Sequence, residues 1–404
     1  MTAERRTVVH SAYVISDGAS ADDAWIMLDD GLVAARGYGG GWRSGAEGAH
    51  VVDAGGRTAV PGFIDLHCHG GGGASAEDVA ADPADLARIV DLHRRHGTTR
   101  SLLSLVSDDL SVLSARSAAL APLVEADPLL LGVHLEGPFL AGSHRGAHRE
   151  AALRTPTPDA LALLQDGGPV TMITIAPELP GAIDAIDALV AAGVIVAIGH
   201  TAADHATARD AFARGARVLT HAFNGMPGIH HRAPGPVVAA LETAEVVIEL
   251  IVDGVHVHPS VIACAMRAAP GRVAFVSDAM AAAGAPDGAY QLGGLDVTVR
   301  DGVATHGADD ALAGSTLTLD RALANAVAAG IPLVDAVTAL TSTPASVLGL
   351  QGRIGTLTPG AAADLVLLGE DLVPDAVWAG GVLVHLAPVL CDRERSRAAR
   401  PVGS

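Results

Sequence analysis

VTMITIAPE at residues 170–178 and VIVAIGHT at residues 194–201 flank the Ala-rich segment LPGAIDAIDALVAAG at residues 179–193. Each flanking run is short, apolar and rich in β-branched residues, which is typical of a buried strand. The segment between them has the composition of a helix. Strand, helix and strand in this order predict a parallel sheet that is covered by helices.

The same pattern recurs along the middle of the chain, where apolar runs alternate with helix-like segments. The runs are FIDLHCH (63–69), RSLLSLVS (100–107), LLGVHLEG (130–137), VTMITIAPE (170–178), VIVAIGHT (194–201), VLTHAFN (218–224), VVIELIVDG (246–254) and VAFVSDAM (273–280). Eight such units predict the α/β class and a closed (β/α)₈ TIM barrel, with a seven-strand or open doubly wound sheet as the alternative. A hairpin-like insert, AYQLGGLDVTVRDGVATHG (289–307), interrupts the last unit.

Both ends of the chain have a different texture. TVVHSAYVIS (7–16) and AWIMLDD (24–30) read as short strands, and ADLVLLGE (363–370) repeats that texture near the other end. We therefore predict one small sheet domain from residues 1–59 and 360–392, and a barrel domain from residues 60–359. Residues 393–404 are charged and poor in apolar side chains, which predicts a loose C-terminal tail.

Composition narrows the classes of function. The formal net charge is −19, which argues against a nucleic-acid-binding surface, because such a surface needs a basic face. Three widely spaced cysteines do not form a disulfide framework, and no apolar stretch reaches the length of a membrane helix. With no signal peptide evident, we expect a cytoplasmic protein without a membrane or nucleic-acid partner.

Polar residues occupy the carboxyl ends of the predicted strands. These residues are His67, His69, Glu136, His200, His221 and Asp278. In a barrel they all point to the C-terminal mouth, where active sites form. His67 and His69 project to one side of their strand, and Cys68 between them should point the other way. Imidazole and carboxylate together suit a borderline divalent metal, Zn²⁺ first, with Fe²⁺, Co²⁺ or Mn²⁺ as substitutes.

Each of these residues also has an ordinary structural interpretation. A lone histidine at a strand end is more often a satisfied core or surface residue, and a His-x-His pair alone leaves both interpretations open. Six such residues at strand ends are hard to explain as core packing, because burying them unpaired is costly. The set as a whole therefore favours a metal site.

Several motifs carry a resemblance to a known family. They are PGFIDLHCHG, HLEGPF, GHT, THAFNGM, HRAPG, DGVHVHP, SDAM and LAGSTL, in this order between about residues 50 and 370. With them the chain resembles the amidohydrolase superfamily and, within it, the N-acetylglucosamine-6-phosphate deacetylases. HLEGPF followed by RGAH, and FNGM followed by Arg-x-Pro-Gly, are the most specific to this branch.

The resemblance implies roles for individual residues. Glu136, His200 and His221 match the metal ligands that all members keep. His67 and His69, with Asp278, match a second site, so one or two ions per subunit are both expected, and Asp278 also matches the catalytic acid and base. Further matches concern the substrate: Arg232 and His256 for the phosphate and sugar, and Ala147, His148, Asn224, Gly225, Leu312, Ala313 and Gly314 for the sugar.

The implied reaction is hydrolysis of N-acetyl-D-glucosamine 6-phosphate to D-glucosamine 6-phosphate and acetate, in amino-sugar catabolism and recycling. The alternatives are an amidohydrolase for N-acetylgalactosamine 6-phosphate, an N-acyl amino acid or a cyclic amide, and a non-catalytic barrel scaffold. A cyclic-amide enzyme is disfavoured because no obvious lysine is present for a carbamylated bridge, a place that Glu136 takes. The resemblance also implies a homodimer, a small β-sandwich domain formed by both chain ends and a metal-dependent (β/α)₈ barrel as the catalytic domain.

Overall fold

The computed structural model describes residues 6–388 of the chain. They form two compact units: residues 65–92 with 100–331, and residues 6–64 with 93–99 and 332–388. The predicted tail at residues 393–404 lies outside the described residues. The domain bounds predicted from the sequence stay a prediction.

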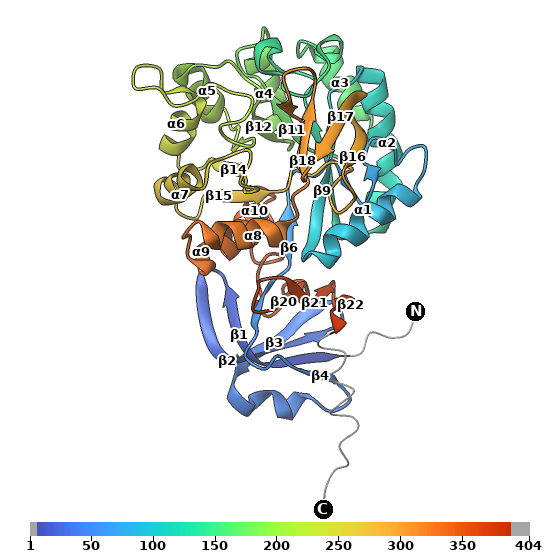
Figure 1. The fold of residues 1–404 in the computed structure, drawn as a ribbon, viewed down its shortest axis with the longest axis vertical. Helices are drawn as coiled ribbons and strands as arrows, with labels where there is room; N and C mark the ends of the chain where they lie inside the picture. Colours follow the sequence, from blue (N-terminus) through green and yellow to red (C-terminus); the bar gives the residue numbers. More distant parts are fainter. Residues whose placement is uncertain (1–5, 389–404) are drawn as a thin grey trace, which may run out of the picture. The chain divides into compact units, whose positions relative to one another are not determined.

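The first unit contains a (β/α)₈ barrel, as the alternation of apolar runs and helical segments predicts (Figure 1). Its sheet has the order β15-β14-β13-β12-β11-β10-β9-β6. The strands are β6 (Phe63–Asp65), β9 (Thr98–Val106), β10 (Leu130–Glu136), β11 (Val170–Ile175), β12 (Ile195–Ile198), β13 (Val218–Leu219), β14 (Val247–Ile251) and β15 (Val273–Val276). The ring nearly closes at the carboxyl end, where Asp278 N donates a hydrogen bond to His67 O (2.8 Å).

A helix follows each barrel strand. These helices are α1 (Ala84–Arg95), α2 (Leu110–Ala126), α3 (Pro158–Asp166), α4 (Ala182–Ala191), α5 (His205–Ala213), α6 (Gly235–Glu242), α7 (Pro259–Ala268) and α8 (Leu319–Ala328). The loop after β6 carries the short strands β7 (Gly70–Gly71) and β8 (Ala74–Ser75). None of the helices among residues 6–388 has both the length and the hydropathy needed to cross a membrane.

The predicted insert forms a small antiparallel sheet of its own. It comprises β16 (Gly288–Leu292), β17 (Leu295–Arg300), β18 (Val303–His306) and β19 (Ala311–Leu312). Buried apolar residues of this sheet, Leu292, Val297 and Val299 among them, share a core with Val106 and Met280. The insert is therefore packed against residues from the ends of β9 and β15.

The second unit contains a sheet of its own, to which strands from residues 7–61 and from residues 365–386 contribute. Its order is β22-β21-β20-β5-β1-β2-β3, and β4 pairs with β1. The strands are β1 (Thr7–Ser16), β2 (Ala19–Asp29), β3 (Leu32–Tyr38), β4 (His50–Asp53), β5 (Thr58–Pro61), β20 (Leu365–Leu368), β21 (Pro374–Ala379) and β22 (Val382–Leu386). The helices α9 (Leu333–Leu340) and α10 (Ser342–Val347) also belong to this unit.

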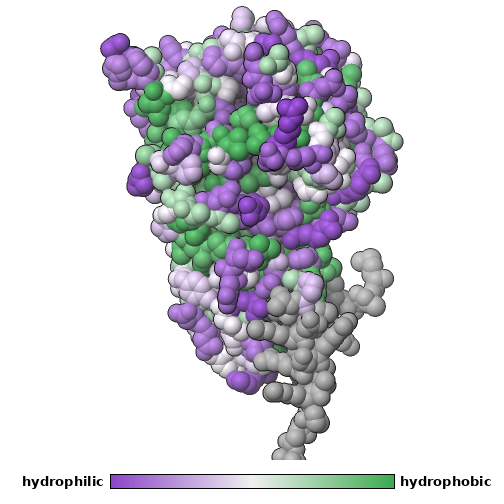
Figure 2. Space-filling model, viewed as in Figure 1, coloured by the Kyte–Doolittle hydropathy of each residue, from purple (hydrophilic) through white to green (hydrophobic). Residues whose placement is uncertain are grey.

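Small aliphatic side chains fill both cores, as the low aromatic content leads one to expect. Alanine, valine, leucine and isoleucine make up most of the buried apolar residues, and Trp378 is the largest fully buried side chain. Figure 2 shows hydrophobic residues on one face of the molecule in patches between hydrophilic ones. Small side chains let helices lie close to a sheet, which suits this layered architecture.

Candidate metal centre and active site

The predicted ligands lie at matching positions after their strands. His200, His221 and Asp278 each stand two residues beyond the last residue of β12, β13 and β15. Glu136 is the final residue of β10, and all of these side chains are nearly or fully buried. Because parallel strands end at the same rim, equal offsets bring residues that are distant in sequence to one place.

Three of these residues have an unusual backbone. His200, His221 and Asp278 have positive φ angles of 46°, 25° and 48°. Residues other than glycine adopt this left-handed region rarely and at a cost, and such strain concentrates at functional sites. At each of these strand ends the strained turn directs the side chain into the cluster.

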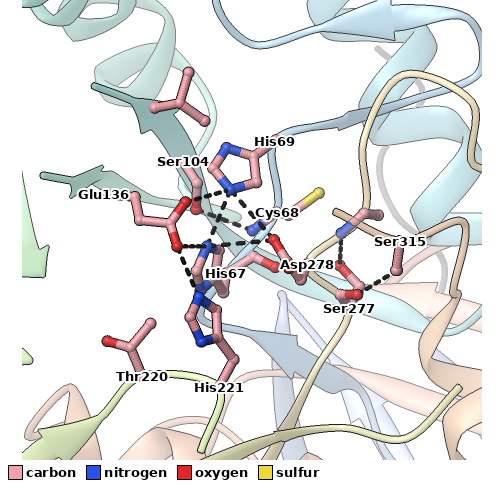
Figure 3. Close-up of polar contacts among 12 residues, drawn as sticks. His67, Cys68, His69, Ser104, Glu136, Thr220, His221, Ser277, Asp278 and Ser315 are labelled. Carbon is pink, nitrogen blue, oxygen red and sulfur yellow. Dashed lines mark hydrogen bonds and ion pairs between the residues drawn. The ribbon is translucent and has the colours of Figure 1, made fainter. Parts of the chain in front are cut away.

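The imidazole and carboxylate groups converge on one another (Figure 3). His67 Nε2 lies 3.0 Å from His69 Nε2 and 3.5 Å from Asp278 Oδ1. His69 Nε2 lies 3.3 Å from the same oxygen. Cys68 turns its sulfur away, and the sulfur contacts Gly70 O at 3.6 Å, as the strand alternation predicts.

Glu136 is the centre of the cluster. Its Oε1 lies 3.0 Å from His200 Nε2 and 2.9 Å from His221 Nε2. Its Oε2 lies 3.2 Å from His69 Nε2 and 3.3 Å from His148 Nε2. One carboxylate therefore joins ring nitrogens from several strand ends.

The donor atoms fit a divalent ion. Around a tetrahedral ion with bonds of about 2.0–2.2 Å, neighbouring donors lie roughly 3.3–3.6 Å apart. Here the separations run from 2.9 Å (His221 to Glu136) to 3.5 Å (His67 to Asp278). Among the predicted ligands, two groups of donor atoms lie close enough to hold an ion: His67 with Glu136 and His221, and His67 with His69 and Asp278.

The hydrogen bonding of His200 supports this fit. Its Nδ1 donates to His144 O at 2.9 Å, so the tautomer that this bond selects has its lone pair on Nε2. This bare nitrogen faces Glu136 Oε1 and, at 3.1 Å, His221 Nε2. A nitrogen lone pair that faces a carboxylate is repelled unless a positive charge lies between them. Glycine is needed beside this ring, because a Cβ on Gly225 (φ +59°) would lie 2.8 Å from Nδ1.

The electrostatics of the cluster also call for positive charge. Burial would raise the pKa of Glu136, but the neighbouring imidazoles, His67 foremost, hold it well below its usual range. Burial likewise opposes ionisation of Asp278, yet His67 and His69 lower its pKa to about 2. Burial would lower the pKa of His69, whereas Asp278 and Glu136 raise it to about 10. Both carboxylates are therefore negative at neutral pH, and a bound cation can take the place of imidazole protons.

The cluster opens into a cavity of about 320 Å³, within the range of small-molecule sites. Of the predicted site residues, 12 line it: His69, Glu136, Ala147, His148, His200, His221, Asn224, Gly225, His256, Asp278, Leu312 and Gly314. His67 is fully buried behind the lining, and Ala313 is buried too. Val106, Gly146, Phe223, Leu292 and Ala311 complete the wall.

His148 presents a hydrogen-bond donor to this cavity. Ser107 N donates to its Nδ1 at 3.2 Å, so the proton of the neutral ring is on Nε2. Burial lowers the pKa of His148 to about 4, although Glu136 acts in the opposite direction. At neutral pH the side chain is therefore an uncharged N–H donor on the cavity wall.

His256 is held by an aspartate that the sequence analysis did not single out. Asp253 Oδ2 lies 2.7 Å from His256 Nδ1, and Asp253 Oδ1 accepts from the backbone N–H of His256 at 2.9 Å. Burial would lower the pKa of His256, but Asp253 raises it. Asp253 thereby orients the ring on the cavity wall and favours its protonated form.

Arg232 lies apart from the residues above. It is exposed, is absent from the described lining of the cavity, and contacts His231 Nε2 through Nη1 at 2.7 Å. The predicted contact between Arg232 and a phosphate group stays a prediction.

Two buried polar residues near the cluster were also missed. Glu249 is fully buried in β14, and its Oε2 lies 3.6 Å from His67 Nδ1. His134 is fully buried in β10, between Ser104 Oγ (3.0 Å) and Thr174 Oγ1 (2.9 Å). The sequence signal for both is a polar residue inside an otherwise apolar strand. Such a residue indicates a buried polar contact, because a polar side chain is rarely buried without a partner.

Comparison with known proteins agrees with this site. The model of the amidohydrolase family matches residues 58–384. The chain belongs to the amidohydrolase family. N-acetylgalactosamine-6-phosphate deacetylase of Escherichia coli O157:H7 is 34% identical over 93% of the chain and 98% of that protein. N-acetylglucosamine-6-phosphate deacetylase of Homo sapiens is 37% identical over 83% of the chain and 85% of that protein.

Solved structures lead to the same family. A variant of N-acetyl-D-glucosamine-6-phosphate deacetylase from Mycobacterium smegmatis, in complex with N-acetyl-D-glucosamine-6-phosphate, has a TM-score of 0.89 and 39% identity. The comparison covers 94% of this amidohydrolase and 99% of that chain. The enzyme from Pasteurella multocida has a TM-score of 0.88 at 27% identity, over 94% and 99% of the two chains. As an amidohydrolase, the chain is a hydrolase that acts on an amide.

Proposed function

We propose that the chain hydrolyses N-acetyl-D-glucosamine 6-phosphate to D-glucosamine 6-phosphate and acetate, in amino-sugar catabolism and recycling. The observation that carries the proposal is a buried cluster of four histidines and two carboxylates at the bottom of a cavity. The relatives named above act on acetylated amino-sugar phosphates and cover most of the chain. A predicted homodimer and a cytoplasmic location are part of the proposal.

The proposed ligands are Glu136, His200 and His221 for one ion, whose donor atoms lie 2.9–3.1 Å apart, and His67, His69 and Asp278 for a second. Zn²⁺ is the proposed metal, because imidazole and carboxylate donors suit it, and Fe²⁺, Co²⁺ and Mn²⁺ are the alternatives. When bound, a divalent ion lowers the pKa of water from about 15.7 toward about 7 and polarises an amide carbonyl.

Asp278 is the proposed general base and acid. It lines the cavity and is ionised at neutral pH, so its free carboxylate can accept a proton from the attacking water. The oxygen of that water bonds to the acetyl carbon. Asp278 then gives the proton to the sugar nitrogen as the C–N bond breaks, which leaves a free amine and acetate.

The cavity wall supplies the remaining roles in the proposal. His148 donates its Nε2 hydrogen to the acetyl carbonyl oxygen, where negative charge develops. His256, which also lines the cavity and is held by Asp253, binds the sugar or its phosphate. Asn224, Gly225 and the loop Leu312–Gly314 would hold the sugar itself. Binding energy at the sugar and phosphate then fixes the position of the amide.

One assay tests the proposed function. Purified protein is expected to release acetate from N-acetylglucosamine 6-phosphate, to lose this activity after dialysis against a chelator, and to regain it with Zn²⁺. The E. coli relative favours a second candidate, the galactosamine epimer, so both 6-phosphates belong in the assay. Faster turnover of the galactosamine epimer would support the second candidate. Undiminished activity in the metal-free protein would contradict the metal-dependent reaction.

Arg232→Ala tests the predicted phosphate contact. We expect KM for the phosphorylated sugar to rise about 10- to 100-fold, since a hydrogen bond to a charged group contributes roughly 1.5–3 kcal/mol. KM for unphosphorylated N-acetylglucosamine should stay the same. Arg214→Ala is the matched control, because Arg214 is exposed and pairs with Asp187 at 2.6 Å. Equal losses on both substrates would show that Arg232 does not bind the phosphate.

A further inference from the structure

Glu249 is an acidic residue where the fold favours apolar ones. It lies in the middle of β14, whose other residues, Val247, Ile248, Leu250 and Ile251, are all buried and apolar. The side chain is fully buried, and its Oε1 has no hydrogen-bond partner among the described residues. Burying a carboxylate costs free energy unless it is well paired, so an apolar residue here would favour stability. A role other than stability is therefore to be sought.

The contacts of Glu249 lead to two of the proposed metal ligands. Its Oε2 accepts a hydrogen bond from the backbone N–H of His221 at 3.3 Å. The same oxygen lies 3.6 Å from His67 Nδ1, just beyond hydrogen-bond length, and a shift of a few tenths of an ångström would close this gap. His67 Nδ1 has no hydrogen-bond partner among the described residues.

This arrangement favours one nitrogen of His67 as the metal-binding atom. With its proton on Nδ1, facing the Glu249 carboxylate, the ring presents a bare Nε2 to His69, 3.0 Å away, and to the rest of the cluster. Without Glu249, a proton on Nδ1 would face no acceptor, and the tautomer with the proton on Nε2, which cannot bind a metal, would gain population. A carboxylate behind a metal-binding histidine commonly fixes the ring in this way.

The other proposed ligands differ in this respect. His200 has a backbone carbonyl, that of His144, as the acceptor for its Nδ1. The Nδ1 atoms of His69 and His221 have no hydrogen-bond partner among the described residues. Glu249 thus places a carboxylate near the Nδ1 atom of a proposed ligand, His67. It also accepts a hydrogen bond from the main chain of His221, where φ is +25°.

We propose that Glu249 is a positioning residue of the metal centre. It orients the His67 ring directly and the His221 ring through its main chain, so that a nitrogen of each ring can bind a divalent ion. This inference rests on the metal ligands of the proposed function. It predicts different effects on two properties when the Glu249 carboxylate is replaced by an amide. Metal binding becomes weaker, but the metal-free protein is not destabilised, because an imperfectly paired buried carboxylate is removed.

The test is Glu249→Gln, which keeps the size of the side chain. Metal-free protein is titrated with Co²⁺ against a competing chelator, and its thermal unfolding is measured separately. We expect metal affinity to fall about 10- to 100-fold, as is typical when the partner of a metal ligand is lost. The metal-free Tm should be equal to or above that of the parent.

Glu178→Gln is the matched control. Glu178 also accepts hydrogen bonds next to a proposed ligand, from Thr201 Oγ1 and Ala202 N, but its carboxylate makes no hydrogen bond to a ligand ring within residues 6–388. Its metal affinity should equal that of the parent. If Glu249→Gln does not fold, Glu249→Asp replaces it, because the shorter side chain withdraws the carboxylate from His67 and should weaken metal binding similarly.

The outcomes separate this inference from the proposed function. Unchanged affinity in Glu249→Gln, on a parent that binds Co²⁺, overturns the positioning role and leaves the metal centre intact. A fall in the metal-free Tm with unchanged affinity shows a structural role only and also overturns it. A parent that binds no divalent ion refutes the proposed function itself.

Discussion

Asp278→Asn is expected to lower kcat by roughly 10²- to 10⁴-fold, because general acid–base catalysis contributes about that much, while the folded protein still binds the ion held by Glu136, His200 and His221. An amide has the shape of the carboxylate but cannot accept the proton of the attacking water. The fold around the residue should persist, since its backbone oxygen still accepts from Ser315 N (2.7 Å) and its N–H still donates to His67 O (2.8 Å).

A matched substitution checks that the loss is specific. Asp301 is exposed in the turn between β17 and β18 and has a φ of 51°, close to the 48° of Asp278. Aspartate and asparagine both tolerate this backbone conformation, so Asp301→Asn should leave kcat and Tm unchanged. Near-normal turnover in Asp278→Asn, measured as acetate release with metal content determined in parallel, would rule out the proposed acid–base role.

Glu136→Gln is expected to weaken metal binding by more than about 100-fold. Removing a residue that only hydrogen-bonds to a metal ligand already lowers metal affinity about 10- to 100-fold, and Glu136 is itself a proposed ligand. Acetate release should fall below detection. Both oxygens of Glu136 face ring nitrogens, with His200 and His221 on one and His69 and His148 on the other. An amide removes the negative charge that favours a cation there.

Metal content after dialysis, determined by mass spectrometry, measures this effect. Glu178→Gln is the control for the change from carboxylate to amide and should keep its metal. A Glu136→Gln protein that retains the full metal content of the parent would contradict the assignment of Glu136 as a ligand. Near-ultraviolet circular dichroism of both variants distinguishes loss of metal from loss of fold.

Much of the fold could be predicted because it depends on local patterns. The alternation of apolar runs with Ala-rich segments predicts a (β/α)₈ barrel, and the barrel is observed. The same reasoning placed His200, His221 and Asp278 at one rim, and the structure brings their side chains together. Parallel strands share one direction, so sequence position relative to a strand end is enough to predict the rim where a residue lies.

The partners of these residues could not be predicted in the same way. Glu249 lies beside His67 only because closure of the barrel brings β14 near the turn after β6, a contact between residues far apart in the chain. The proton position on His148 depends on Ser107 N, 41 residues away. Arg232, which the motif places on the phosphate, is exposed on a loop outside the described cavity lining.

The sequence by itself determined the barrel, the rim of the site and the residue types that gather there, because strand periodicity and strand direction are local properties. Only the tertiary structure decided which nitrogen of His148 and of His200 is engaged in a hydrogen bond, and that the buried Glu249 carboxylate lies behind His67. Whether a hydrogen bond forms depends on differences of a few tenths of an ångström in the distance between two atoms, and no local sequence pattern specifies such distances.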